Sequence, residues 1–193
     1  HLKELSHKNQ CDDDVVSFLG AGAYRHRIPT AVTELSGRSE FLTPYTPYQP
    51  EIAQGTLQAT FEYQSLMCRI FDMDISNASL YDGSTALAEA ALMALRIGRD
   101  RKTLLICETV HPEYREILTT LLDHEHATLH VLPAENGKFN RGALKDHLND
   151  DLAGVIVQYP NFFGIVEDFE EIVTMTHDAG GLFITSTPEP ISL

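Results

Sequence analysis

Four short apolar runs decide the fold: TLLIC at residues 103–107, TLHVL at 128–132, GVIVQ at 154–158 and LFIT at 182–185. Each run has the length and the β-branched content of a buried strand. The runs recur about every 26 residues, with one stretch of helical pattern between each pair, which is typical of parallel strands joined by crossover helices. The sequence therefore predicts an α/β fold with a mostly parallel sheet and flanking helices.

Helical patterns fill the gaps between these runs and continue upstream of them. Between the strands we expect helices near residues 112–124, 141–148 and 168–179. Upstream, an apolar stripe predicts a helix over 51–72, directly after a proline, and an alanine-rich stretch predicts another over 84–97 that stops at a glycine. Together these elements make residues 51–193 the regular part of the chain, a partial α/β domain.

Residues 1–50 do not show this regular pattern of strands and helices. Glycines and prolines interrupt short apolar pieces, so we expect an irregular N-terminal segment. Within it, FLGAGA at 18–23 has two interpretations, a dinucleotide-binding turn or a tight turn that needs small residues. The third glycine of the dinucleotide pattern is missing and Pro29 comes before any clear helix, which favours the tight turn.

Composition narrows the function classes. The formal net charge of −14 argues against a nucleic-acid partner, and no apolar run reaches the roughly 18 residues that cross a membrane. The three cysteines, Cys11, Cys68 and Cys107, have neither disulfide nor zinc spacing, and Cys107 is expected in the core. No acidic group has calcium-loop spacing, so no metal site is predicted.

Polar residues follow several strands or open helices at what should be one edge of the sheet. Ser84 and Thr85 open the alanine-rich helix, as an anion site or as part of a simple cap. His111 and Asn161 each follow a strand and could serve a ligand or only their own loops. Because three such positions share one edge, we predict a ligand crevice there.

The segment YTPYQPE at 45–51 is rich in proline and tyrosine. Proline suppresses helix and favours an extended backbone, so the segment should project as a rigid arm. It could contact another subunit or a ligand, or lie over its own core. The candidate interface residues are Tyr45, Pro47, Tyr48, Gln49 and Glu51.

Several long strings resemble one known family. They are FLGAGAY at 18–24, TPYTPYQPE at 43–51, NASLYDGSTA at 77–86, HPEYR at 111–115 and PNFFG at 160–164. These strings are similar to the glycine cleavage system P-protein and, within that family, to subunit 1 of its two-subunit bacterial form. The resemblance implies the large domain of a pyridoxal-phosphate-dependent transferase of the aspartate-aminotransferase type (fold type I), here truncated.

The resemblance also implies a reaction and a set of sites. The family decarboxylates glycine with pyridoxal phosphate and passes an aminomethyl group to lipoylated H-protein. By the family pattern, Ser84 and Thr85 match the phosphate-binding helix start, and His111 matches the residue that stacks on the pyridine ring. The expected aspartate at the end of the last strand is replaced by Ser186, and the segment that would carry the Schiff-base lysine lies beyond Leu193.

We therefore expect a subunit whose own pocket is degenerate and which has no catalytic residue that can be assigned with the sequence alone. The resemblance implies that subunit 2 holds the pyridoxal phosphate, in a heterotetramer in the cytoplasm. A non-catalytic assembly subunit is the alternative. A third interpretation, a complete enzyme cut short, requires a lysine downstream of Leu193.

Overall fold

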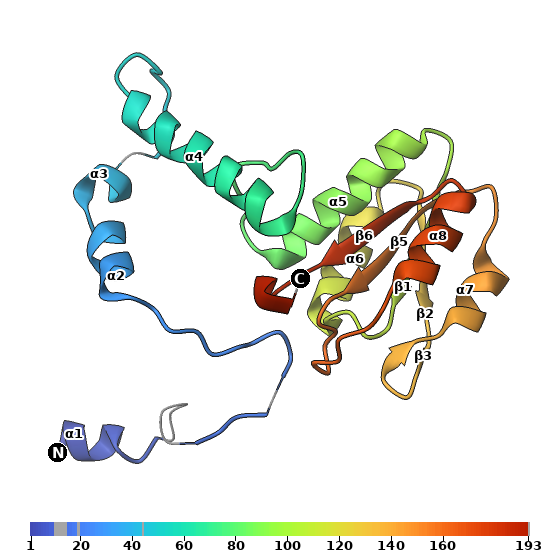
Figure 1. Cartoon of the computed structure of the whole chain (residues 1–193), viewed down its shortest axis with the longest axis horizontal. Coiled ribbons are helices and arrows are strands. Elements are labelled where there is room, and N and C mark those ends of the chain that lie inside the picture. The colour runs from blue at the N-terminus through green and yellow to red at the C-terminus, as the bar shows by residue number, and fades with distance from the viewer. Residues whose placement is uncertain (10–14, 19, 44, 193) are drawn as a thin grey trace.

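The computed structural model describes residues 1–9, 15–18, 20–43 and 45–192, so Cys11 and the acidic run at 12–14 lie outside the described residues. Figure 1 shows an α/β layer to which a long N-terminal part is attached. The elements, in chain order, are α1 (Leu2–Ser6), α2 (Thr30–Ser36), α3 (Ser39–Leu42), α4 (Gln54–Phe71), α5 (Gly83–Gly98), β1 (Thr103–Cys107), α6 (Pro112–Leu122), β2 (Thr128–Leu132), β3 (Ala134–Glu135), β4 (Lys138–Phe139), α7 (Arg141–His147), β5 (Leu152–Gln158), α8 (Glu170–Asp178), β6 (Leu182–Ser186) and the 3₁₀ turn η1 (Pro190–Ser192).

The main sheet has four parallel strands in the order β2-β1-β5-β6. Strands β1 and β5 lie in the middle, and every residue of both is buried. Central parallel strands are covered on both faces, which explains why these two runs are continuously apolar instead of alternating. The predicted α/β fold with a mostly parallel sheet is confirmed.

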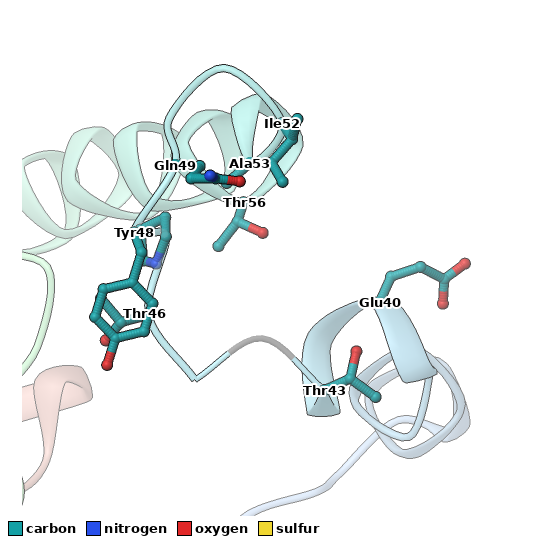
Figure 2. Close-up of a pocket in the computed structure, with 9 residues that line it drawn as sticks. Glu40, Thr43, Thr46, Tyr48, Gln49, Ile52, Ala53 and Thr56 are labelled. Carbon is teal, nitrogen blue, oxygen red and sulfur yellow. The ribbon is translucent and has the colours of Figure 1, made fainter.

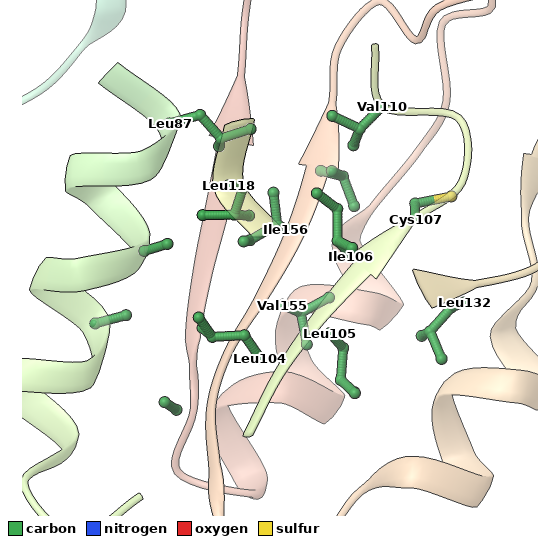
Figure 3. Packing of buried hydrophobic residues seen from close by; sticks show 14 of the residues in the cluster. Leu87, Leu104, Leu105, Ile106, Cys107, Val110, Leu118, Leu132, Val155 and Ile156 are labelled. Atoms are coloured by element: carbon green, nitrogen blue, oxygen red, sulfur yellow. The ribbon is translucent and has the colours of Figure 1, made fainter. Parts of the chain in front are cut away.

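The core lies between this sheet and the helices on its two faces. Figure 3 shows Leu104 and Ile156 on the side of α5, whereas Leu105 and Val155 lie on the opposite side of the sheet. This is the two-residue alternation of a strand. Small residues of α5 such as Ala91 and Ala94 are fully buried, so the helix approaches the sheet closely. Cys107 is 1% exposed, which confirms its predicted place in the core.

Arg101 closes the sheet at the end opposite to the strand carboxyl termini. Its Nη1 donates hydrogen bonds to the carbonyl oxygens of Leu152 (2.8 Å) and Ala179 (2.7 Å). Gly180 adopts a φ of +76°, and a Cβ there would lie 2.5 Å from Arg101 Nη2. The guanidinium thus ties the start of β5 to the turn after α8.

Two features differ from the expectations. The segment expected to be irregular, residues 1–50, contains the short helices α1, α2 and α3, which have too few turns for an apolar periodicity to be seen. The hairpin of β3 and β4 was also not predicted, although its Asn136-Gly137 turn, with φ of +54° and +74°, is a strong hairpin signal. Elsewhere the predicted elements agree with the observed ones to within a few residues.

Candidate functional site

The carboxyl ends of β1, β5 and β6 meet at one edge of the sheet, and α5 and α6 both begin there. Open α/β sheets bind their ligands outside this edge. A small cavity of about 200 Å³ lies there, between α5, α6 and the end of β6. Its lining residues are Gly83, Ala86, Leu87, Ala90, Tyr114, Ile184, Thr185, Ser186, Thr187 and Pro188.

The start of α5 is capped by Asp82. The Asp82 carboxylate accepts hydrogen bonds from Ser84 Oγ (2.6 Å) and from the backbone N–H of Thr85 (2.8 Å). Thr85 Oγ1 lies 3.0 Å from the same oxygen, Oδ1, and accepts a bond from the Asp82 backbone N–H (3.1 Å). The hydrogen bond from Ser84, followed by that from Thr85, lowers the pKa of Asp82. Both hydroxyls predicted for an anion are therefore engaged by a side chain of this chain.

His111 caps the next helix, α6. The ring Nδ1 of His111 accepts a hydrogen bond from the backbone N–H of Glu113 (3.3 Å), and the backbone N–H of His111 donates to the Oε1 of the buried Gln158 (2.8 Å). The imidazole stacks on Tyr114, with ring centroids 4.8 Å apart, and meets the edge of Phe162 at 5.1 Å. The ring thus contacts Tyr114 of the helix that it caps and Phe162 of the loop after β5.

Asn161 is fully buried in the loop after β5. Its Nδ2 donates to the Gly137 carbonyl (2.8 Å) and to Glu167 Oε1 (3.0 Å). Its Oδ1 accepts from the N–H groups of Phe163 (3.0 Å) and Ile165 (3.1 Å). The amide therefore ties the loop to the β3–β4 hairpin, and a role for Asn161 toward a ligand stays a prediction.

The stretch from Gly20 to His26 crosses the same edge of the sheet. The N–H of Ala21 donates to the Phe162 carbonyl (3.0 Å), and Gly22 lies against Pro188. His26 Nε2 lies 2.5 Å from Glu189 Oε2, although the two residues are 163 positions apart. The Gly20–Gly22 backbone has left-handed φ values and no helix follows before α2, so the tight-turn interpretation is confirmed.

Tyr24 lies in this crossing stretch with its hydroxyl buried. Among the side chains that the structure describes, Tyr24 Oη is the one buried polar atom for which no hydrogen-bond partner is found. Burial, and then the nearby Glu189 carboxylate, raises the pKa of Tyr24. The phenol therefore stays neutral at physiological pH.

The predicted arm lies away from this edge, between α3 and α4 (Figures 1 and 2). It borders a larger hollow of about 610 Å³, lined by Glu40, Thr43, Thr46, Pro47, Tyr48, Gln49, Ile52, Ala53 and Thr56. Tyr45 and Tyr48 are 91% and 76% exposed, and their rings stack at 6.5 Å. Glu51 is exposed and is not among the residues that line the hollow. The arm residues thus do not meet Ser84, His111 or Asn161 within this chain.

Sequence reasoning did not single out Tyr114, Gln158 or Glu189. Tyr114 follows His111 by three positions on one helix, a spacing that places two side chains side by side and could have shown the stacked pair. Gln158 ends an apolar strand, where a polar residue marks the sheet edge. No local signal pairs His26 with Glu189.

No metal cluster is evident in the part of the chain that the structure describes, where no three His, Cys, Asp or Glu residues are placed to share an ion. In the same part, no helix combines the length and the apolar character needed to span a lipid bilayer.

Comparison with known proteins gives the family. The family model described as "Glycine cleavage system P-protein" matches residues 1–193. The chain is 52% identical to "Probable glycine dehydrogenase (decarboxylating) subunit 1" of Geotalea daltonii and 48% identical to the protein of that name from Desulfitobacterium hafniense. Both matches cover all of this chain, but the chain spans only 43% of the length of these relatives.

Comparison with solved structures leads to the same family. An inhibitor-bound glycine decarboxylase (P-protein) of the glycine cleavage system matches 98% of this chain and 42% of its own, with 42% identity and a TM-score of 0.86. An aminotransferase from Eubacterium rectale, at 18% identity and a TM-score of 0.53, shares the fold alone. This confirms the transferase-type fold that the sequence predicts, and the chain belongs to the glycine cleavage system P-protein family.

Proposed function

We propose that this chain is part of subunit 1 of a two-subunit glycine dehydrogenase (decarboxylating), and that it contributes to catalysis only together with subunit 2. The names of its relatives support the subunit and the reaction. In this proposal the complex is a cytoplasmic heterotetramer that decarboxylates glycine and transfers the aminomethyl group to lipoylated H-protein. Pyridoxal phosphate, held by subunit 2, supplies the electron sink.

One observation carries the assignment of the cofactor to the partner. The cavity at the sheet edge is lined by neither a lysine nor a carboxylate. Its strand-end position is Ser186, and its lining has no charged side chain. Pyridoxal enzymes place a charged partner, such as an aspartate, beside the pyridinium nitrogen. The residues present at this edge do not fit the cofactor.

The candidate residues then divide into two groups. Ser84, Thr85, His111 and Asn161 are the proposed remnants of a cofactor pocket. None of them lines the cavity of about 200 Å³, and the side chains of Ser84, Thr85 and Asn161 make hydrogen bonds within the chain. Tyr45, Pro47, Tyr48, Gln49 and Glu51 are the proposed contact with the partner and its active site. Their exposed tyrosines support this placement, because tyrosine is enriched in the cores of protein interfaces.

The test compares full-length subunit 1 alone, subunit 2 alone and the two together. We expect the visible absorption band of protein-bound pyridoxal phosphate only in samples that contain subunit 2, and release of CO₂ from carboxyl-labelled glycine only from the complex with H-protein present. A band from subunit 1 alone that disappears on replacing one of its own lysines would overturn the proposal and favour a complete enzyme.

The alternative, a purely structural subunit, predicts a different result for the arm. If the arm reaches the partner's active site, Tyr45→Ala in the intact complex lowers turnover while the complex stays assembled in sedimentation. Under the structural alternative, turnover falls only in proportion to dissociation.

A further inference from the structure

The start of α5 is the point where a phosphate group would bind in this fold, and here a carboxylate of the chain lies in that place. The first N–H groups of a helix have no partner within the helix, and with the helix dipole they attract anions. In this chain, Asp82 Oδ1 accepts from the N–H of Thr85 (2.8 Å), from Ser84 Oγ (2.6 Å) and from Thr85 Oγ1 (3.0 Å). One side-chain oxygen thus collects the donors that a phosphate oxygen would need.

The charge of this carboxylate matters as much as its position. The hydrogen bonds from Ser84 and Thr85 lower the pKa of Asp82, so the side chain is ionised at neutral pH. A phosphate that approached the same helix start would meet a negative charge only a few ångströms away and would compete with it for the same donors. Like charges at such a distance repel one another.

The volume and the lining of the cavity also do not suit pyridoxal phosphate. Its volume of about 200 Å³ is below the roughly 300–1,000 Å³ of ordinary ligand pockets. Tyr114 lines this cavity and lies close to the start of α5, since its Oη lies 2.5 Å from the place where a Cβ of Gly83 would stand. Burial raises the pKa of Tyr114, as do the Asp82 and Glu113 carboxylates. The phenol therefore stays neutral, and no lysine, arginine or histidine lines the cavity to balance the charge of a phosphate.

We propose that Asp82 is a built-in anion that occupies the phosphate position of the crevice and thereby keeps phosphate-bearing ligands out of this subunit. The inference rests on the proposed function, in which subunit 2 holds the cofactor, and it names the side chain that excludes the cofactor from subunit 1. Ser84 and Thr85 then serve the carboxylate and not a ligand.

Two variants of the full-length chain test this, both without subunit 2. Asp82→Asn removes the charge and keeps a side-chain oxygen that can cap the helix, because asparagine caps as well as aspartate. Asp82→Gly removes the side chain, and glycine is among the residues that helix N-caps tolerate well. The matched control is Asp168→Asn, since the Asp168 carboxylate also accepts a backbone N–H, that of Glu170, at the start of a helix, α8 (2.9 Å).

Binding is measured by calorimetry at low ionic strength with two probes, inorganic phosphate and pyridoxine 5′-phosphate. The second probe has no aldehyde and cannot form a Schiff base with surface lysines. We expect no saturable binding to the wild-type chain or to Asp168→Asn, and phosphate affinity at least about tenfold higher in both Asp82 variants, because a like charge has been removed. Circular dichroism confirms that each variant is folded.

Two results overturn the inference, and they are distinguishable. If the folded Asp82 variants bind phosphate no better than the wild type, Asp82 is not the excluding group, and the proposed function stands. If the wild-type chain itself binds pyridoxine 5′-phosphate saturably, the crevice is a working cofactor site and the proposed function fails with it.

Discussion

The α/β layer, from α5 to β6, and the N-terminal part of the chain, with helices α1 to α4, differ in how they are stabilised. In the layer, β1 and β5 are buried throughout, and α5 buries six of its residues. In the N-terminal part, the four helices α1 to α4 bury none, and α4 exposes Phe61 and Ile70 by 67% and 50%. The layer thus has its own core, whereas the helices before it in the described part of the chain leave large apolar side chains exposed. Exposed apolar surface of this kind marks an interaction site.

The sharpest test of this difference is a pair of matched truncations. Ile156 is fully buried in β5, so Ile156→Ala should lower the free energy of unfolding by about 2–5 kcal/mol. Ile70 is half exposed on α4, and Ile70→Ala should change it by less than about 0.5 kcal/mol. Urea denaturation of the chain measures both, and equal losses would mean that α4 is packed in solution.

A second test concerns the hydrogen bonds by which Arg101 joins the start of β5 to the turn after α8. Arg101→Ala removes both hydrogen bonds to the carbonyls of Leu152 and Ala179 and should cost about 1.5–3 kcal/mol, since bonds to charged groups are the stronger ones. Arg101→Lys should recover only part of the loss, because an ammonium lacks the planar fork. Full recovery by lysine in urea denaturation would show that charge alone suffices.

For the N-terminal part, the expected effect is on assembly instead of folding. Tyr48→Ala should weaken association with the partner subunit by about 1–2 kcal/mol, as truncation of an interface tyrosine does, and should leave the unfolding of the chain unchanged. Tyr48→Phe keeps the ring and serves as the control. Analytical ultracentrifugation of the mixed subunits measures the effect, and wild-type affinity for Tyr48→Ala would remove the arm from the interface.

The smallest expected effect is the pH dependence contributed by Asp82. Because its pKa is lowered in the folded chain, ionised Asp82 stabilises the fold above the unfolded pKa of about 3.9, and this stabilisation is lost as the pH falls through the lower folded pKa. The wild type should therefore lose slightly more stability than Asp82→Asn between pH 6 and pH 2. Identical pH profiles in chemical denaturation would contradict this.

Much of the fold was predictable because its signals are local. The apolar runs of β1 and β2 predict the strands with their observed bounds. Burial on both faces explains the continuous apolar run of β1, whereas β2 lies at the sheet edge and is mostly exposed. The Asn136-Gly137 hairpin could also have been predicted from its turn residues. Helix bounds were less certain: α4 begins at Gln54 and not at Glu51, because the Gln49–Ala53 stretch forms a turn first.

The candidate site was predictable only in outline. Ser84, Thr85, His111 and Asn161 do lie at or near one edge of the sheet, as strand–helix alternation requires. Whether their side chains are free depends on partners that the sequence does not name, such as the Phe162 ring for His111 and the Gly137 carbonyl for Asn161. Such contacts join residues tens of positions apart, so no local pattern reveals them.

The sequence by itself determined the α/β class, the parallel strands and the family, because apolar periodicity and long characteristic strings are properties of consecutive residues. Only the tertiary structure decided that Asp82 takes the donors at the start of α5, that Tyr114 lies against Gly83 and that the Gly20–His26 stretch crosses the sheet edge as far as Glu189. The physical reason is that each of these contacts joins residues that only folding brings close together in space. The order of residues along the chain does not show which of several possible partners will lie close enough.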